Sequence, residues 1–234
     1  MSKREDIIEP EMAGRARRGL VYSEILGWID LGHAQGRDII NLLEEMRRGE
    51  IYTDPYYDLV YAQSMNMSGF CAGNSIRWKV KKGRSLHERH SIALALMMQV
   101  SLQFEGLQVS APYNWFTDSG FSAEDLVSNL LGFYRVVRPM NYFPHLKLIS
   151  KAKALERWDY YGAVGVYKNK LFRPLLFPEP TVNKAVTPSY GTLPSFMTAI
   201  QPFNNFNKGV VEIERPSSRH DGLAFMYGSK YACR

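Results

Sequence analysis

Residues 85–132 constrain the fold most, because a long apolar segment is followed there by an aromatic loop and a second apolar segment. Ser85 and, three residues later, Glu88 are typical of a capping box, in which both side chains accept hydrogen bonds from backbone N–H groups at a helix start. The run from Ile92 to Leu107 is apolar on most sides, which predicts a helix buried in a core.

The second apolar segment repeats these start signals. Ser122 and Asp125 have the spacing of a cap, and a hydrophobic staple is predicted between residues 121 and 126. Gly132 is expected to end this helix. We assign Glu124 and Asp125 to helix capping.

Length and composition indicate a globular protein. The chain has 234 residues, 45% of them hydrophobic, which is enough for a large core and is not typical of a disordered protein. We predict an α+β fold: a flexible charged arm at 1–18 and a single compact domain at 19–234. A central buried helix, a β-hairpin and a proline-rich irregular segment at 172–203, expected to be a wrap or lid, would make up the domain.

Other elements follow from periodicity and turn signals. A buried strand is predicted at 25–31 and a helix at about 36–48. Strands at 57–65 and 75–82 would form the hairpin, with residues 66–74 as its loop. A helix at about 146–158 and short strands at 210–213 and 223–227 complete the prediction.

The net charge of +6 favours anionic partners such as cell-wall polymer, lipid headgroups or nucleic acid. Nucleic acid is disfavoured, because the densest basic run, from Lys79 to Arg84, looks like a solvated strand end and no recognised nucleic-acid-binding module is present. No apolar run has the length of a membrane span, and the charged start lacks the apolar region of a secretory signal. We therefore expect synthesis in the cytoplasm, with export of the folded protein by a dedicated secretion machine left open.

Glu105 breaks a local rule. It lies in the last turn of the apolar helix, where the helix dipole and the loss of water both disfavour a carboxylate. Such exceptions are enriched at functional sites, so Glu105 is a catalytic candidate. The alternative is a carboxylate that pairs with an arginine or faces solvent.

His33 is the strongest histidine candidate, because it follows a predicted strand and precedes a predicted helix. Strand ends often display catalytic side chains on a rigid scaffold. Asp30 would orient the imidazole if the turn brings it back. The alternative is a histidine that only fills a turn.

Cys71 stands between glycines and is a candidate thiolate nucleophile if a histidine reaches it. Its best partner is His220, in the sequence RHDGLAFMYG, which resembles the histidine strand of NlpC-type papain-like amidases. In that family the nucleophile begins a buried helix, whereas Cys71 is predicted in a hairpin loop. An incidental buried cysteine is the alternative, and Cys233 is expected to be a bystander.

The loop after the central helix carries Tyr113, Trp115 and Phe116, which are candidates for the floor of a sugar or peptide groove. Asp118 follows them and is a candidate to pair with Glu105, because two carboxylates in different environments can divide acid and nucleophile roles. The alternative is that the aromatic residues belong to the core and Asp118 begins a turn.

Metal and cofactor signals are few. His87 and His90 lie three residues apart on the predicted helix, but the HExxH spacing is missing, so we predict no metal site. The chain has no P-loop, no GxGxxG before a helix, no GxSxG and no CxxC pair. The sequence leaves open whether any cofactor is used.

The segments GWIDLGHA (27–34) and FSAEDLVSNLLG (121–132), with the helix that contains Glu105, resemble a bacterial domain-of-unknown-function family. The resemblance covers about the first 140 residues and brings no established activity. It implies that His33 and Glu105 belong to one site, together with Asp118 or Asp125. Many members resemble exported or lipid-anchored proteins, and this chain lacks their signal.

Two functions remain from the sequence. The first is a hydrolase that cleaves an amide or glycosidic bond of peptidoglycan, as an antibacterial effector with an immunity protein as partner. The second is a non-enzymatic binding or structural protein of a secretion or phage-like assembly, whose proline-rich segment wraps a partner.

Overall fold

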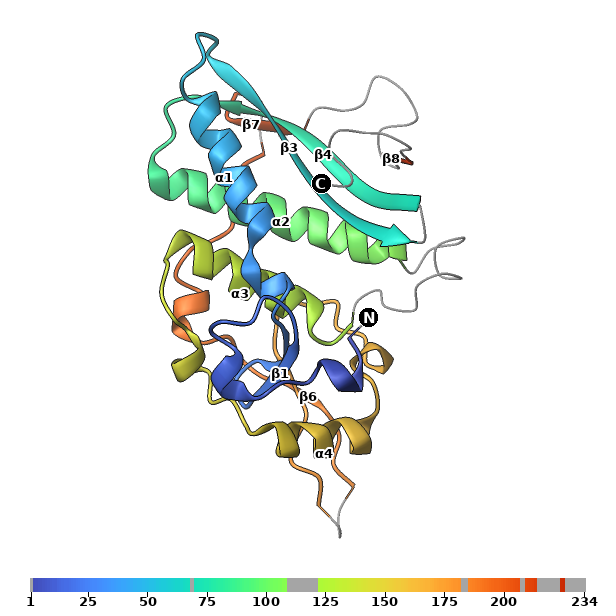
Figure 1. Ribbon diagram of the computed structural model, residues 1–234. Helices are drawn as coiled ribbons and strands as arrows, with labels where there is room; N and C mark the ends of the chain where they lie inside the picture. The colour runs from blue at the N-terminus through green and yellow to red at the C-terminus, as the bar shows by residue number, and fades with distance from the viewer. Residues whose placement is uncertain are drawn as a thin grey trace. The chain divides into compact units, whose positions relative to one another are not determined.

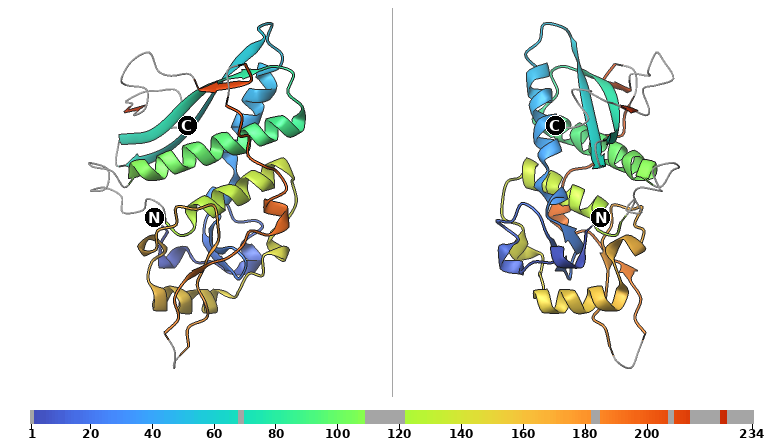
Figure 2. Two further views of the ribbon diagram at one scale, coloured as in Figure 1. Left: turned by 180° about the vertical axis from the view of Figure 1, so that it is seen from behind. Right: turned by 45° about the vertical axis from the view of Figure 1, so that its right-hand side comes forward.

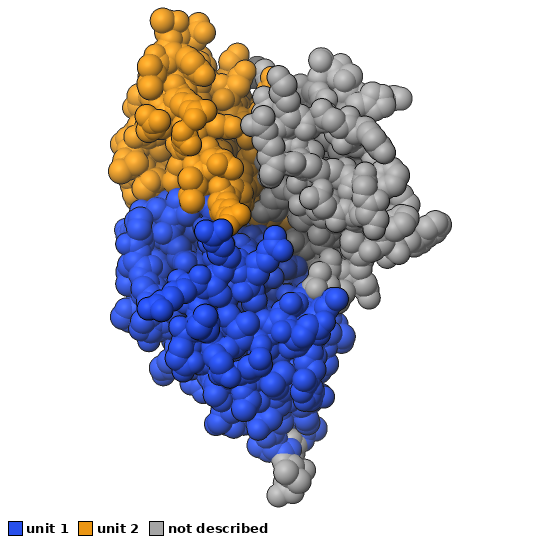
Figure 3. All heavy atoms as spheres, viewed as in Figure 1, with its two compact units in different colours: residues 1–36, 108–199 blue, residues 37–107, 200–234 orange. Residues whose placement is uncertain are grey.

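The computed structural model describes residues 2–67, 70–108, 122–181, 185–206, 209–213 and 224–225. It confirms the α+β class. Instead of the single body expected at 19–234, the chain groups into two compact units: residues 1–36 with 108–199, and residues 37–107 with 200–234 (Figure 3). The chain leaves the first unit after Gly36, returns to it at residue 108 and leaves it again after residue 199.

The first unit contains four short strands and two helices among its described residues (Figure 1). They are β1 (Leu20–Ser23), β2 (Gly27–Asp30), α3 (Asp125–Val137), α4 (Lys151–Tyr161), β5 (Leu175–Leu176) and β6 (Ser189–Tyr190). The described 3-10 turns of this unit are η1 (Arg4–Asp6), η2 (Pro10–Met12), η3 (His33–Gln35), η5 (Phe143–His145), η6 (Val164–Val166) and η7 (Ser195–Met197).

The sheet of the first unit has the strand order β1-β2-β5-β6. β1 and β2 form an antiparallel hairpin where we predicted one strand at 25–31, and β2 and β5 are parallel. Gly27 permits the β2–β5 contact, because a Cβ atom there would lie 2.1 Å from the carbonyl oxygen of Leu175. Its φ of +74° also favours glycine.

Aromatic side chains fill the core of this unit. Trp28 lies edge-on to both Tyr22 and Trp158, with ring centroids 5.2 and 5.9 Å apart. The Tyr22 hydroxyl donates to the carbonyl oxygen of Phe177 at 2.8 Å and accepts from its N–H at 2.7 Å. The start of the proline-rich segment is therefore part of the core at Phe177; a lid role for the rest of 172–203 stays a prediction.

The prediction of a flexible arm at 1–18 is wrong. Ile7 is completely buried and pairs with Leu20 in an isolated β-bridge, and Ala13 is buried as well. Arg4 forms a bidentate ion pair with Asp159 of α4, with N–O distances of 2.7 and 2.8 Å. The charged side chains are exposed, but the apolar residues between them hold the segment against the unit.

Two helix boundaries in this unit differ from the prediction. α3 continues for five residues beyond Gly132, because a glycine inside a helix can serve close packing as well as termination. α4 begins at Lys151 and not at 146, since the N–H of Ile149 donates to the carbonyl oxygen of Tyr22 and Ser150 caps the helix.

The second unit combines two helices with a sheet of strand order β3-β4-β7. Its elements are α1 (Arg37–Gly49), β3 (Tyr56–Met67), β4 (Phe70–Lys81), α2 (Leu86–Gln108), β7 (Val211–Ile213) and β8 (Ala224–Phe225), which pairs with β4. The helix at 36–48, the long apolar helix, the hairpin and the two C-terminal strands are thereby confirmed. α2 runs along the hairpin in all three ribbon views (Figures 1 and 2).

The hairpin is longer than predicted. Its ladder runs from the Tyr56–Lys81 pair to the Met67–Phe70 pair, so most of the expected loop at 66–74 is strand. Cys71 therefore lies within β4, opposite Asn66, and not in a loop. The pairing of the two strands continues through residues that carry turn signals, up to the Met67–Phe70 pair.

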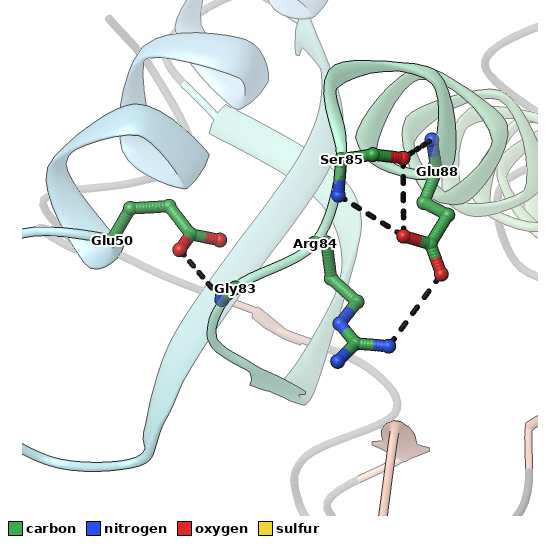
Figure 4. A network of polar contacts seen from close by, with 5 residues as sticks. All are labelled: Glu50, Gly83, Arg84, Ser85 and Glu88. Atoms are coloured by element: carbon green, nitrogen blue, oxygen red, sulfur yellow. Dashed lines mark hydrogen bonds and ion pairs between the residues drawn. The ribbon is translucent and has the colours of Figure 1, made fainter.

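The capping box of α2 is present as predicted (Figure 4). The Ser85 hydroxyl accepts from the N–H of Glu88 at 3.2 Å, and the Glu88 carboxylate accepts from the N–H of Ser85 at 3.0 Å. Glu50, at the end of α1, accepts from the N–H of Gly83 at 2.8 Å. This network closes the turn between β4 and α2. None of the helices in the described part of the chain is long and apolar enough to cross a membrane.

Candidate functional site

The candidate site lies in the first unit, around the turn that follows β2. Asp30 ends the strand, and its Oδ1 accepts from the N–H groups of Gly32 and His33 at 2.6 and 3.1 Å. An aspartate that binds the backbone two and three residues ahead is a common turn device. Asp30 therefore shapes the turn that displays His33, and the expectation that it also orients the imidazole stays a prediction.

The imidazole is positioned by α3. Nδ1 of His33 lies 2.9 Å from Oδ1 of Asn129. Because an amide oxygen can only accept, Nδ1 carries the proton in this contact. One turn of the helix also holds the strand end, since the N–H of Asp30 donates to Oγ of Ser128 at 3.0 Å.

Two close contacts fix the turn on the helix. A Cβ atom at Gly132 would lie 2.7 Å from the carbonyl oxygen of His33, and one at Gly36 would lie 2.5 Å from the carbonyl oxygen of Gly132. Arg135 adds a hydrogen bond of 2.6 Å to the carbonyl oxygen of Ala34. The site therefore requires glycine on both sides of the η3–α3 contact.

Glu124 is the buried carboxyl of the site. Only 2% of it is exposed, and its Oε2 has no hydrogen-bond partner within the described part of the chain. Burial raises the pKa of Glu124 to about 7. Its own backbone and the charge of His33 lower this pKa, whereas the charge of Asp30 raises it further. Such a group holds its proton near neutral pH, where an ordinary glutamate has lost it.

Ser2 joins the two carboxyl groups. Its Oγ lies 3.3 Å from Oδ2 of Asp30 and 3.3 Å from Oε1 of Glu124. The two carboxyl oxygens are therefore no farther apart than twice that distance. A serine hydroxyl has one proton to donate, so the arrangement is best satisfied when Glu124 is protonated and donates to Ser2, which then donates to Asp30.

This grouping has the elements of acid–base chemistry. One carboxyl is dry and holds a proton, the other is partly exposed and accepts three hydrogen bonds from backbone and hydroxyl donors, and an exposed imidazole stands beside them. In known enzymes, two neighbouring carboxyl groups in such different environments can divide the roles of acid and of base or nucleophile.

His33 lies in η3, directly after β2 and before α1, as expected, and its catalytic role stays a prediction. Glu105 lies in α2, where only its backbone is described, so a shared site with His33 stays a prediction. Asp125, the other residue implied by the family resemblance, accepts from the N–H of Ser122 at 3.0 Å and serves the helix start.

Other predicted residues stay untested. Cys71 is described only in its backbone. Tyr113, Trp115, Phe116, Asp118 and His220 lie outside the described residues. His87 and His90 lie in the first turns of α2, and no three histidine, cysteine, aspartate or glutamate side chains group as a metal-binding set among the residues that the structure describes.

Asn129 and Ser2 were not predicted as site residues from the sequence, and Glu124 was assigned only to helix capping. Acidic residues are common in the first turn of a helix, so the sequence around Glu124 and Asp125 indicates only helix capping. The available signal was the helix itself, because Ser128 and Asn129 interrupt an otherwise apolar segment. Polar residues on a buried helix need partners, and here those partners are Asp30 and His33.

Comparison with known proteins adds no relative. No family model matches the chain, and no curated protein or solved structure matches it significantly.

Proposed function

We propose that the protein is a hydrolase that uses Glu124 and Asp30 as a pair of catalytic carboxyl groups on an anionic cell-wall polysaccharide. The observation that carries the proposal is the buried carboxyl of Glu124, with its raised pKa, in contact through one hydroxyl with the carboxylate of Asp30. Of the amide and glycosidic bonds of peptidoglycan, this pair favours the glycosidic bond, because glycosidases use two carboxyl groups in this way.

The spacing of the pair favours retention of configuration. Retaining enzymes hold their carboxyl groups about 5 Å apart, whereas inverting enzymes need about 6.5 Å or more. The two contacts of 3.3 Å meet at one oxygen, and a hydroxyl oxygen bonds at a bent angle, so the pair is closer than twice 3.3 Å. The first geometry therefore fits better.

In the proposed reaction, Glu124 gives its proton to the glycosidic oxygen as the bond to the anomeric carbon breaks. An oxygen of Asp30 attacks that carbon and forms a glycosyl ester. Water then attacks the same carbon, its proton returns to Glu124, and the ester bond breaks to restore the Asp30 carboxylate. The products are two shortened sugar chains, and the two carboxyl groups regain their starting protonation.

His33 and the net charge support the choice of an anionic substrate. His33 is the exposed member of the group, and its charge acts on Glu124. The net charge of +6 attracts an acidic polymer to the protein as a whole. Action as an antibacterial effector, with an immunity protein as partner, is the biological setting that we attach to this proposal.

The test is digestion of purified peptidoglycan, with the products identified by mass spectrometry and their anomeric configuration by NMR. Wild type should release sugar fragments with retained configuration. Glu124→Gln should lower kcat by at least about 100-fold, since it removes the acid. Asp30→Asn should do the same while keeping the oxygen that accepts the two turn N–H groups.

The matched control is Glu156→Gln, which removes an exposed carboxylate from the same unit and should keep full activity. Wild-type activity in both carboxyl variants would reject this site. Absence of products from wild type would favour the non-enzymatic binding function.

A further inference from the structure

A short N-terminal segment covers the carboxyl pair. Residues 2–6, here called the N-terminal strap, reach the site through one side chain, Ser2, which is partly buried. The next four residues are exposed. The hydroxyl of Ser2 thus forms hydrogen bonds with both carboxyl groups of the site, one of which is buried. In the proposed function, the same two carboxyl groups must contact the substrate.

Two anchors of different strength hold the strap. Beyond its inner end, Ile7 is completely buried and pairs with Leu20. Nearer Ser2, Arg4 binds Asp159 through an ion pair whose two side chains are 52% and 55% exposed. Ion pairs in this setting are weak, because water competes for both charges. The strap can therefore open at Arg4 while Ile7 keeps the fold intact.

The geometry of Ser2 is that of a ligand hydroxyl. An alcohol oxygen between two carboxyl oxygens accepts from the protonated carboxyl and donates to the ionised one. A sugar hydroxyl or the glycosidic oxygen of a polysaccharide offers the same acceptor, and Oε2 of Glu124, which has no partner in the described structure, provides a further donor or acceptor.

We propose that the strap is a built-in substrate mimic: Ser2 holds the place of a sugar hydroxyl between Asp30 and Glu124, and opening of the Arg4–Asp159 contact admits the polysaccharide. The inference rests on the proposed function for the identity of the ligand. The strap itself follows from the contacts of Ser2, Arg4 and Ile7. The N-terminal strap would then act as an internal inhibitor of the site.

The variant Arg4→Ala opens the outer anchor in the full-length protein. Lys153→Ala is the matched control, because it breaks another exposed ion pair of α4, with Glu179 at 3.0 Å. The first readout is the titration midpoint of the Glu124 carboxyl, followed by carbon-13 NMR. Opening the strap admits water, and burial is the main cause of the raised pKa, so the midpoint should fall by about one pH unit or more.

Ser2→Ala keeps the strap in place but removes the hydroxyl that accepts from protonated Glu124. Because the acid form of Glu124 then loses a hydrogen bond, this variant should also lower the midpoint. The second readout is the initial rate of peptidoglycan digestion. Arg4→Ala should increase this rate up to about fivefold, as expected for loss of one exposed ion pair, and Lys153→Ala should leave it unchanged.

The possible results distinguish a failure of the strap proposal from a failure of the proposed hydrolase function. A wild-type midpoint and a wild-type rate in Arg4→Ala would overturn the inference. Shifted midpoints without products from any variant would reject hydrolysis, and with it the role of Ser2 as a substrate mimic. A lowered midpoint together with a raised rate is the result that supports it.

Discussion

The carbonyl oxygen of His33 lies against Gly132 in the middle of α3, where a Cβ atom would be 2.7 Å away. This contact brings the turn after β2 onto the helix that supplies Asn129, and it places Asp30 and Glu124 on either side of Ser2. A residue expected to end a helix instead allows the helix to carry the candidate site.

Gly132→Ala should destabilise the protein by about 1–3 kcal/mol, because a methyl group would push the η3 turn off the helix. The sign is diagnostic, since replacing glycine by alanine inside an ordinary helix gains about 1 kcal/mol. Urea unfolding measures the change. Gly14→Ala is the control: its Cβ would meet only the side chains of Asn141 and Phe143, at 3.7 Å or more, and its effect should stay within about 0.5 kcal/mol. A stabilised Gly132→Ala variant would contradict the close contact.

Glu124 should make the protein less stable as the pH rises from about 4.5 to about 7. Its pKa is raised in the folded state, so in this window the folded protein retains a proton that the unfolded chain has released. The contribution is absent below the unfolded pKa and complete above the folded one. With about 1.4 kcal/mol per pKa unit, it reaches about 3 kcal/mol.

Urea unfolding of wild type and Glu124→Gln across this pH range measures that contribution. Glutamine cannot ionise, so the variant should gain stability relative to wild type as the pH increases. Asp30 and His33 face the same carboxyl and are present in both proteins, so the difference between the two curves isolates Glu124. A difference that does not change with pH would show that Glu124 has an ordinary pKa.

Asn129→Ala should reduce kcat by about tenfold with little change in KM, because the imidazole of His33 loses its fixed orientation. Asn129→Asp keeps an acceptor oxygen and should restore much of the rate. Nitrogen-15 NMR of His33 provides an independent readout: wild type and Asn129→Asp should keep the proton on Nδ1, and Asn129→Ala should not. The same tautomer in all three proteins would mean that Asn129 does not position His33.

Ser85→Ala should destabilise the second unit by about 1 kcal/mol, because the N–H of Glu88 loses the hydroxyl that caps α2. The change is measured by urea unfolding followed by helical circular dichroism. Ser189→Ala replaces an exposed serine on a two-residue strand and should have little effect. Equal stabilities of the two variants would show that the box does not contribute.

Local patterns predicted much of the second unit. The capping residues Ser85 and Glu88, the apolar run of α2 and the alternation around Trp78 each depend on neighbours within a few residues, and the structure confirms the helix and the hairpin. The ladder exceeded the prediction because pairing across a hairpin continues through residues that carry turn signals. The first unit was less predictable, since its strands are short and pair with distant segments.

The sequence by itself determined the α+β class, the position of most helices and the position of His33 after a strand, because these depend on periodicity and on short-range backbone hydrogen bonds. Only the tertiary structure decided which groups meet at the site. Asp30 and Glu124 lie 28 and 122 residues from Ser2 in the sequence, and no local rule connects the three. Their chemistry arises from burial: Glu124 is an ordinary acidic residue in the sequence, and it becomes a proton-holding group because folding removes water from around it.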